Sequence, residues 1–242
     1  MAIFERDDVR IGYEEHGEGF AVLLIAPGGM QSRRAAWSRA PWNPMKTPTL
    51  RDRYRVIAMD QRNAGESTAP VSAEDGWATY TADQLALMDH LGIDRFAVVG
   101  MCIGGPYIMG LCRAAPERVV AAVMLQPIGE QGNRKSFFGL FDGWAESIRA
   151  EHPEADASAW ESFRHAMFGG EFMFGASRQD VASLTAPLLV LMGDDLFHPA
   201  AISREVADLA PNATLIERWK EGEDLAAADA AIGAFLGQHT TT

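Results

Sequence analysis

Short apolar runs rich in β-branched residues recur along the chain, and the segments between them are long enough to form helices. From the second run onward the runs are nearly continuous rather than alternating, which is typical of strands covered on both faces. The expected strands are 9–14, 21–26, 55–59, 96–99, 119–125, 188–192 and 213–217. The pattern predicts an α/β fold with a mostly parallel sheet flanked by helices.

Helical signals lie in the segments between these strands. The apolar positions between 80 and 91 share one helix face, and Gly92 follows where a left-handed C-cap favours glycine. A similar pattern covers 225–236. Pro199 can open a helix that runs to about Ala210, because its missing N–H costs nothing in the first turn.

Residues 130–182 interrupt this alternation and are rich in aromatic side chains. Seven of the twelve phenylalanines and two of the six tryptophans lie there. We expect 130–182 to form a small helical cap insertion on a core made of 1–129 and 183–242. Most of the rings are expected to form the insertion's own small core. Phe138 and Phe172 are expected to face a cleft below and to favour a substrate with an apolar part.

The composition excludes several classes of partner. The chain has 242 residues, 48% of them hydrophobic, and its 21 basic and 33 acidic side chains give a net charge of −12. This length favours one domain or one domain with an insertion. Surplus negative charge opposes binding to nucleic acid and to an anionic membrane surface, so a small-molecule substrate is expected. The composition leaves open whether the chain also pairs with a second copy of itself as a homodimer.

The sequence carries no signal for a membrane segment, a metal or a cofactor. No apolar run suits a signal peptide or a spanning helix, which predicts a cytoplasmic protein. No Cys/His cluster has zinc-ligand spacing, so neither a metal nor a cofactor is expected. If Cys102 and Cys112 share one helix, they lie about 15 Å apart, beyond the roughly 7 Å Cα limit for a disulfide. Both are therefore expected to be free thiols.

The sharpest local feature is residues 96–106, FAVVGMCIGGP, where a strand runs into a glycine-flanked cysteine and then a helix. Gly100 and Gly104 permit a tight strand-to-helix turn around Cys102. At a helix N-terminus, unpaired N–H groups and the positive dipole end favour a thiolate. The N–H of Ile103 is placed to face a developing oxyanion. The segment has the form of a nucleophile elbow, G-x-S-x-G, with cysteine in place of serine.

Three further segments extend this pattern, and with them the chain resembles the α/β-hydrolase fold superfamily over nearly its whole length. They resemble the family's oxyanion loop, its D-x-R-G-x-G-x-S turn and the strand that carries the triad acid. Their sequences are LIAPGGM at 24–30, MDQRNAGES at 59–67 and PLLVLMGDD at 187–195. A thiol nucleophile is similar to that of the dienelactone-hydrolase branch.

The resemblance implies a role for several individual residues. Cys102 is expected to be the nucleophile, the N–H groups of Gly29 and Ile103 the oxyanion hole, and Asp195 the triad-type acid, with Asp194 as its alternative. Met30, next to Gly29, and Met101, next to Cys102, are expected to contact the substrate.

The family's histidine is absent from its usual place after the last strand, near 217–224. His198 is the main candidate for the base, because it follows Asp195 by three residues in a loop at the carboxyl end of a strand. Alternatively, His198 only caps the helix that begins near Pro199, or His165 of the insertion reaches the cleft. Two arrangements stay open: a base paired with Cys102, or a thiolate without a base in a pocket that either catalyses unaided or only binds.

These features predict a hydrolase of small, largely apolar carboxylic esters, lactones or thioesters that forms an acyl-cysteine. C–C bond hydrolysis, acyl transfer and ligand binding without turnover are the alternatives, because sites rather than folds carry function. Residues 31–50 hold three arginines and one lysine in an otherwise acidic chain. This local positive patch is either a solvated surface or a place where an arginine pairs with a substrate carboxylate.

Overall fold

An eight-stranded, mostly parallel sheet forms the centre of the computed structural model, which describes residues 1–240. The strand order is β1-β2-β4-β3-β5-β6-β7-β8, and only the pairs β1–β2 and β2–β4 are antiparallel. The strands are β1 (Ala2–Arg6), β2 (Val9–His16), β3 (Ala21–Ile25), β4 (Arg55–Met59), β5 (Phe96–Met101), β6 (Val119–Leu125), β7 (Leu188–Leu191) and β8 (Ala213–Ile216). The predicted fold class is confirmed.

Every run predicted as a strand forms one, and β4 and β6 have the predicted bounds. β5 extends two residues beyond its prediction, because Gly100 and Met101 still pair with β6. The strand β1, in which only Phe4 is buried, was not predicted. An edge strand with one buried side chain offers no apolar run to detect.

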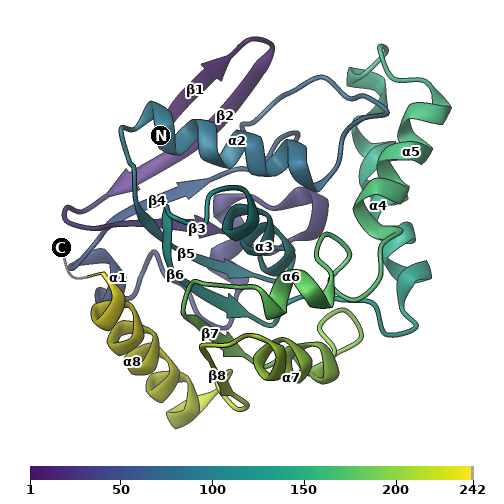
Figure 1. The fold of residues 1–242 in the computed structure, drawn as a ribbon. Coiled ribbons are helices and arrows are strands. Elements are labelled where there is room, and N and C mark those ends of the chain that lie inside the picture. Colours follow the sequence, from purple (N-terminus) through teal and green to yellow (C-terminus); the bar gives the residue numbers. More distant parts are fainter. Residues whose placement is uncertain (241–242) are drawn as a thin grey trace.

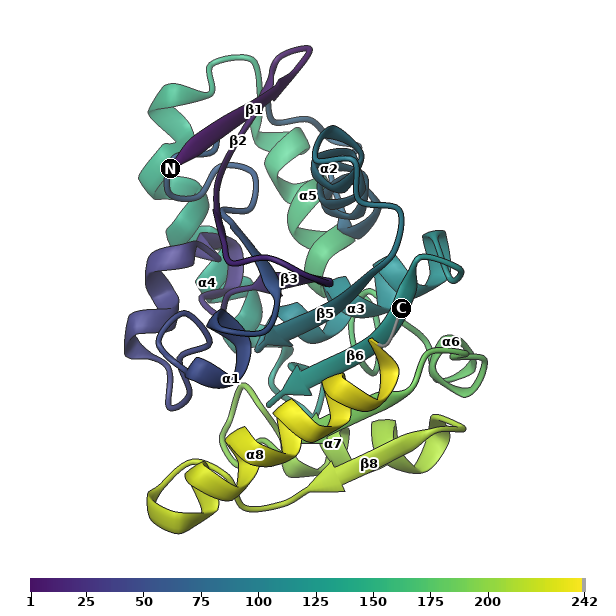
Figure 2. The same ribbon diagram turned by 90° about the vertical axis from the view of Figure 1, so that its left-hand side faces the viewer.

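Helices cover both faces of the sheet (Figures 1 and 2). Along β3, alternate side chains enter different hydrophobic clusters: Leu23 and Ile25 pack on one face, Val22 and Leu24 on the other. This two-sided burial explains the continuous apolar runs. The α-helices are α1 (Pro48–Arg51), α2 (Trp77–His90), α3 (Gly104–Ala114), α4 (Arg134–Ile148), α5 (Ala157–Phe168), α6 (Arg178–Ala182), α7 (Ala200–Leu209) and α8 (Gly222–His239). The 3₁₀ helices are η1 (Gly29–Gln31), η2 (Arg34–Arg39) and η3 (Arg149–Glu151).

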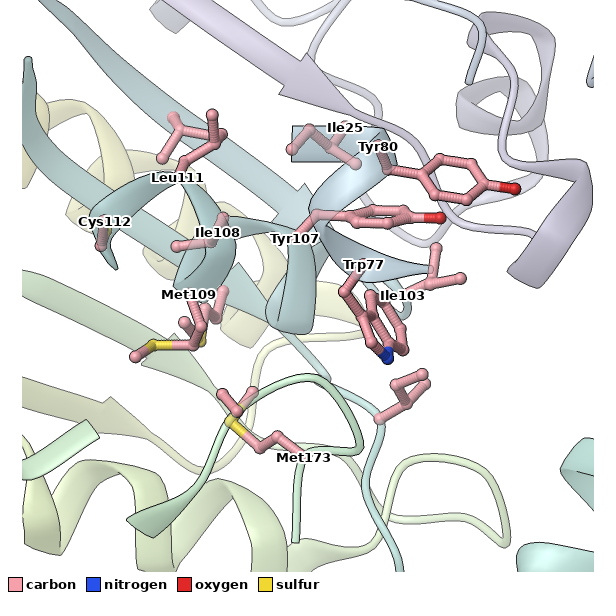
Figure 3. Packing of buried hydrophobic residues seen from close by; sticks show 14 of the residues in the cluster. Ile25, Trp77, Tyr80, Ile103, Tyr107, Ile108, Met109, Leu111, Cys112 and Met173 are labelled. Atoms are coloured by element: carbon pink, nitrogen blue, oxygen red, sulfur yellow. The ribbon is translucent and has the colours of Figure 1, made fainter. Parts of the chain in front are cut away.

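The helix α3 is fixed by aromatic packing against α2 (Figure 3). The ring of Tyr107 stacks on Tyr80 with 5.1 Å between centroids, and Trp77 meets Tyr107 edge-on at 5.1 Å. Ile103, just before α3, is fully buried in the same cluster. Cys112 lies on α3 well away from Ile103, and burial raises the pKa of its thiol to about 12. Both cysteines are free, and Cys112 is a core residue.

The segment between β6 and β7 contains α4, η3, α5 and α6. α4 and α5 lie together on one side of the molecule, and aromatic rings join them (Figure 1). Phe141 meets Phe163 at 5.1 Å between centroids, and Trp144 meets Trp160 at 5.9 Å. Unlike these two helices, α6 packs against α3 and α7. Within residues 1–240, no helix is both long enough and apolar enough to cross a membrane.

Candidate active site

Cys102 lies between β5 and α3 in a left-handed backbone conformation, with a φ of 62°. Its N–H donates to the carbonyl of Leu125 at 3.0 Å, and its own carbonyl accepts the N–H of Ile128 at 3.2 Å. A Cβ at Gly100 would lie 3.0 Å from the backbone of Gly104. The two flanking glycines therefore allow the close approach that the turn requires, and hydrogen bonds to the next strand hold the strained residue in place.

The loop after β7 is folded around the carboxylate of Asp195. Its Oδ1 accepts the N–H groups of Phe197 at 2.9 Å and His198 at 3.0 Å. The Nδ1 of His198 lies 2.8 Å from both carboxylate oxygens. A Cβ at Gly193 would lie 2.2 Å from the carbonyl oxygen of His198, so only glycine fits this turn. The loop thus presents Asp195 and His198 as one unit.

His198 does not cap α7, because Pro199 is the N-cap residue and no side chain bonds to that helix end. The Nε2 of His198 is buried and has no conventional hydrogen-bond partner within residues 1–240. The ring instead turns this edge toward the cavity that Cys102 also lines. The structure therefore brings Cys102, His198 and Asp195 to one place.

Cys102 and His198 stabilise each other's charged forms. Burial disfavours the imidazolium, but the neighbouring Cys102, and then Asp195, outweigh burial and raise the pKa of His198 to about 9. Burial also opposes the thiolate, yet the neighbouring His198 lowers the pKa of Cys102 below its ordinary value. Each of the two groups therefore favours the charged form of the other.

A tryptophan lies where the family resemblance placed a histidine. Trp219 follows β8, is 1% exposed, and donates its Nε1 hydrogen to the carbonyl of Met192 at 2.8 Å. The adjacent Lys220 forms an ion pair with Asp194. Asp194 therefore has another partner, and among the described residues Asp195 is the one of the two carboxylates that contacts the imidazole.

Two backbone N–H groups approach the sulfur of Cys102. They belong to Ile103 and to Gly28, and both lower the pKa of the thiol. Gly28 has a φ of 124°, a conformation that favours glycine. Ile103 was expected here, whereas Gly28 was missed, one residue before the predicted Gly29. Gly29 also lines the cavity, and its role in the oxyanion hole stays a prediction.

An apolar cavity of about 390 Å³ opens over Cys102. The predicted Met30 lines it, but Met101 does not; the buried side chain of Met101 borders a neighbouring cleft. Apolar side chains around the cavity include the rings of Phe137, Trp144, Phe168 and Phe197, together with Ile128 and Leu140. Such a lining suits a ligand with an apolar part.

The other two residues expected to contact substrate, Phe138 and Phe172, do not line this cavity. Successive helix positions differ by about 100°, so Phe137 faces the cavity while Phe138 packs at 5.1 Å between centroids against the exposed His165. Phe172 lies 4.7 Å beneath the guanidinium of Arg178. His165 is thus on the outside of this segment.

The helical spacing of the apolar residues on α4 could have predicted which of them line the cavity. Phe137, Leu140 and Trp144 are three and four residues apart on α4 and share one face. Gln126 was also missed, because it lies just after β6 with no motif around it. No group of side chains within residues 1–240 has the arrangement of a metal site.

Comparison with known proteins places this geometry in context. Residues 21–171 match the family model described as alpha/beta hydrolase fold. The chain is 27% identical to a Mycobacterium tuberculosis protein provisionally named as a non-heme bromoperoxidase, over 86% of this chain and 88% of that one. It is 26% identical to 2-hydroxymuconate semialdehyde hydrolase of Pseudomonas putida, over 85% and 81%. The structure of an enol-lactonase from Burkholderia xenovorans LB400 superposes with a TM-score of 0.70 at 21% identity, covering 98% and 100% of the two chains.

Proposed function

The chain belongs to the alpha/beta hydrolase fold family, and within it we propose a thiol-dependent hydrolase of small, largely apolar carboxylic esters, lactones or thioesters. One observation carries the proposal: His198 contacts Asp195 through Nδ1 and turns its other nitrogen toward the cavity that holds Cys102. A nucleophile, a base and a group that orients the base are the parts that acyl transfer needs.

The acylation step uses the charge distribution of the resting site. The thiolate of Cys102 attacks the ester carbonyl, and the N–H groups of Ile103 and Gly28 or Gly29 stabilise the oxyanion that forms. As the intermediate collapses, the imidazolium of His198 gives its proton to the leaving oxygen or sulfur. The acyl group is then held on Cys102 as a thioester.

Deacylation restores the enzyme through the same residues. Neutral His198, oriented by Asp195, removes a proton from a water molecule that attacks the thioester carbonyl. The carboxylic acid product leaves, and Cys102 returns to its thiolate form beside protonated His198. In this scheme the base comes from the loop after β7, which compensates for the tryptophan after β8.

Further assignments belong to the same proposal. Residues 130–182 act as a cap, because α4 and α5 contribute Phe137, Trp144 and Phe168 to the apolar cavity. This lining supports an apolar acyl or aryl group as part of the substrate. A cytoplasmic location and a second copy of the chain as partner stay predictions.

C–C bond hydrolysis is a second candidate. The similarity to 2-hydroxymuconate semialdehyde hydrolase favours it, because the compound in that relative's name is an aldehyde acid and not an ester. Both reactions require an oxyanion hole and a proton donor near Cys102. Product analysis separates them. Ester hydrolysis releases an acid with an alcohol or thiol, whereas C–C hydrolysis releases an acid with a second fragment whose carbon has taken up a proton.

Hydrolysis of 4-nitrophenyl butyrate tests the proposal. The wild-type chain and Cys112→Ala should turn over this ester equally, whereas Cys102→Ala should lose activity. Rapid quenching and peptide mass spectrometry should find a butyryl group on Cys102. Unchanged turnover in Cys102→Ala would rule out the cysteine mechanism.

A further inference from the structure

A second cleft adjoins the apolar cavity and differs from it in chemistry. Its volume is about 430 Å³, and Arg33 and Arg39 both line it. None of the lining residues within the described chain is acidic. Gly28, Gln31 and Gln126 border both spaces, so a ligand that fills the apolar cavity can extend past them into the cleft.

The two arginines of the cleft are exposed and unpaired. No ion pair within residues 1–240 involves Arg33 or Arg39. By contrast, Arg34 lies between them in sequence and pairs with Asp60 at 3.1 Å and with Glu14 at 3.3 Å. In a chain with a net charge of −12, two guanidinium groups without a carboxylate partner create a local positive field.

Gln126 supplies an independent sign of a ligand at the junction of the two spaces. Its side chain is only 9% exposed, yet its Oε1 has no hydrogen-bond partner among the described residues. Its backbone has a φ of 40° and is held by a 2.7 Å hydrogen bond from its N–H to the carbonyl of Leu191. Buried amide oxygens are nearly always paired, so an unpaired one beside a cavity marks a place where a hydrogen-bond donor of a ligand completes the bonding.

We propose that the substrate carries an oxyanionic group, such as a carboxylate, which the cleft binds through Arg33 and Arg39, while a hydrogen-bond donor of the same substrate reaches Oε1 of Gln126 at the junction. The apolar part of the same substrate fills the cavity over Cys102. Guanidinium groups bind carboxylates through paired, charge-assisted hydrogen bonds. This inference rests on the proposed function. The cleft contributes only to substrate binding and orientation. The bonds that form and break at Cys102 are those of the acylation step described above.

Three butyryl-type esters test the proposal. Phenyl butyrate is neutral, 4-butyryloxybenzoate has a carboxylate on the leaving side, and monophenyl glutarate has one on the acyl side. We expect the double substitution Arg33→Gln and Arg39→Gln to lower kcat/KM about tenfold for at least one carboxylate ester, and less than twofold for phenyl butyrate. In 1 M salt, where the Debye length is about 3 Å, the wild-type preference for that ester should shrink.

Arg95→Gln is the matched control. Arg95 is exposed and precedes β5, at the end of the strand opposite Cys102, and the substitution removes the same charge. Equal losses in Arg95→Gln and in the double variant, or equal losses for neutral and carboxylate esters, would overturn the proposal. So would the absence of any effect on both carboxylate esters.

A failure of the cleft and a failure of the hydrolase proposal give different results. If the wild type hydrolyses none of the three esters, the proposed function fails, and calorimetry with 4-butyryloxybenzoate then tests the cleft alone. Binding that weakens about tenfold in the double variant but not in Arg95→Gln supports an anion site. Equal binding by all three proteins, or none by the wild type, overturns it.

Discussion

The Nδ1 of His198 lies 2.8 Å from both carboxylate oxygens of Asp195, although the two residues are only three positions apart. In the proposed mechanism, one loop after β7 therefore supplies both the base and the group that orients it. The position after β8, where the resemblance placed the histidine, is filled by the buried Trp219. Because the same carboxylate also accepts two backbone N–H groups, it both shapes the loop and fixes the imidazole.

Asp195→Asn separates these two tasks. An asparagine Oδ1 can still accept the backbone N–H groups of Phe197 and His198, but its amide group cannot replace the carboxylate that accepts Nδ1–H and stabilises the imidazolium. We expect kcat/KM for 4-nitrophenyl butyrate to fall by on the order of a hundredfold, with a far-UV spectrum like that of the wild type. Asp194→Asn removes an ion pair with Lys220 and should change the rate less than twofold. Equal rates in both variants would contradict the assignment of Asp195.

The charge state of Cys102 predicts an unusual pH dependence of alkylation. Its lowered pKa means that the thiolate persists as the pH falls below the ordinary thiol range, so iodoacetamide should modify Cys102 faster than a free thiol at neutral pH. Without His198, burial dominates and the pKa rises. His198→Ala should therefore shift the alkylation profile to higher pH. Mass spectrometry of the Cys102 peptide measures this, and an unchanged profile would show that His198 does not act on the thiol.

Turnover should decline on the alkaline side for a separate reason. The raised pKa of His198, about 9, keeps the imidazolium proton available below that pH and removes it as the pH rises through that value. Protonation of a poor leaving group then fails. We expect kcat/KM for an alkyl ester to fall above about pH 9, and to fall much less for 4-nitrophenyl butyrate, whose leaving group needs no proton. Parallel declines for both esters would contradict a proton-donor role.

Most of the fold could be predicted from the sequence, because burial on both faces makes strand runs continuous. Leu23 and Val22 pack into the hydrophobic clusters on opposite faces of the sheet. Both positions are therefore apolar, and such a run can be recognised from its own sequence. The edge strand with Phe4 as its only buried side chain lacks this signal. Register, strand order and the position of α6 against α7 depend on contacts between distant segments, which a single sequence does not contain.

The site was predictable where a local backbone constraint exists. Gly100 and Gly104 mark the turn at Cys102 because a side chain at either position would crowd the neighbouring backbone, and the structure has a tight turn there, with a positive φ at Cys102. The choice between Asp194 and Asp195 was not predictable, since it depends on Lys220, which follows β8, pairing with Asp194 after β7. Gln126 was likewise invisible, because its unpaired amide is a property of the packed site.

Gly100→Ala tests the steric basis of the elbow. The added Cβ would lie 3.0 Å from the backbone of Gly104, which cannot move without disturbing Cys102. We expect a loss of about 1–3 kcal/mol in the free energy of unfolding, measured by urea titration, together with lower activity. Gly139→Ala is the control, because its Cβ meets no atom within 4 Å on the exposed face of α4 and should stabilise the chain by up to about 1 kcal/mol. Equal stabilities would contradict the close approach.

Phe137 and Phe138 are adjacent in sequence but face different surroundings, and leucine at each position tests which ring touches substrate. Phe137 lines the cavity over Cys102, whereas Phe138 packs against His165 and lies 4.8 Å beneath the guanidinium of Arg164. Phe137→Leu removes ring surface from the cavity wall, so kcat/KM should fall several-fold for short acyl esters and recover for longer ones that fill the added space. Phe138→Leu should leave the ratio between short and long esters unchanged, since its ring does not line the cavity. A shift of that ratio by Phe138→Leu and not by Phe137→Leu would mean that α4 presents its other face to the substrate.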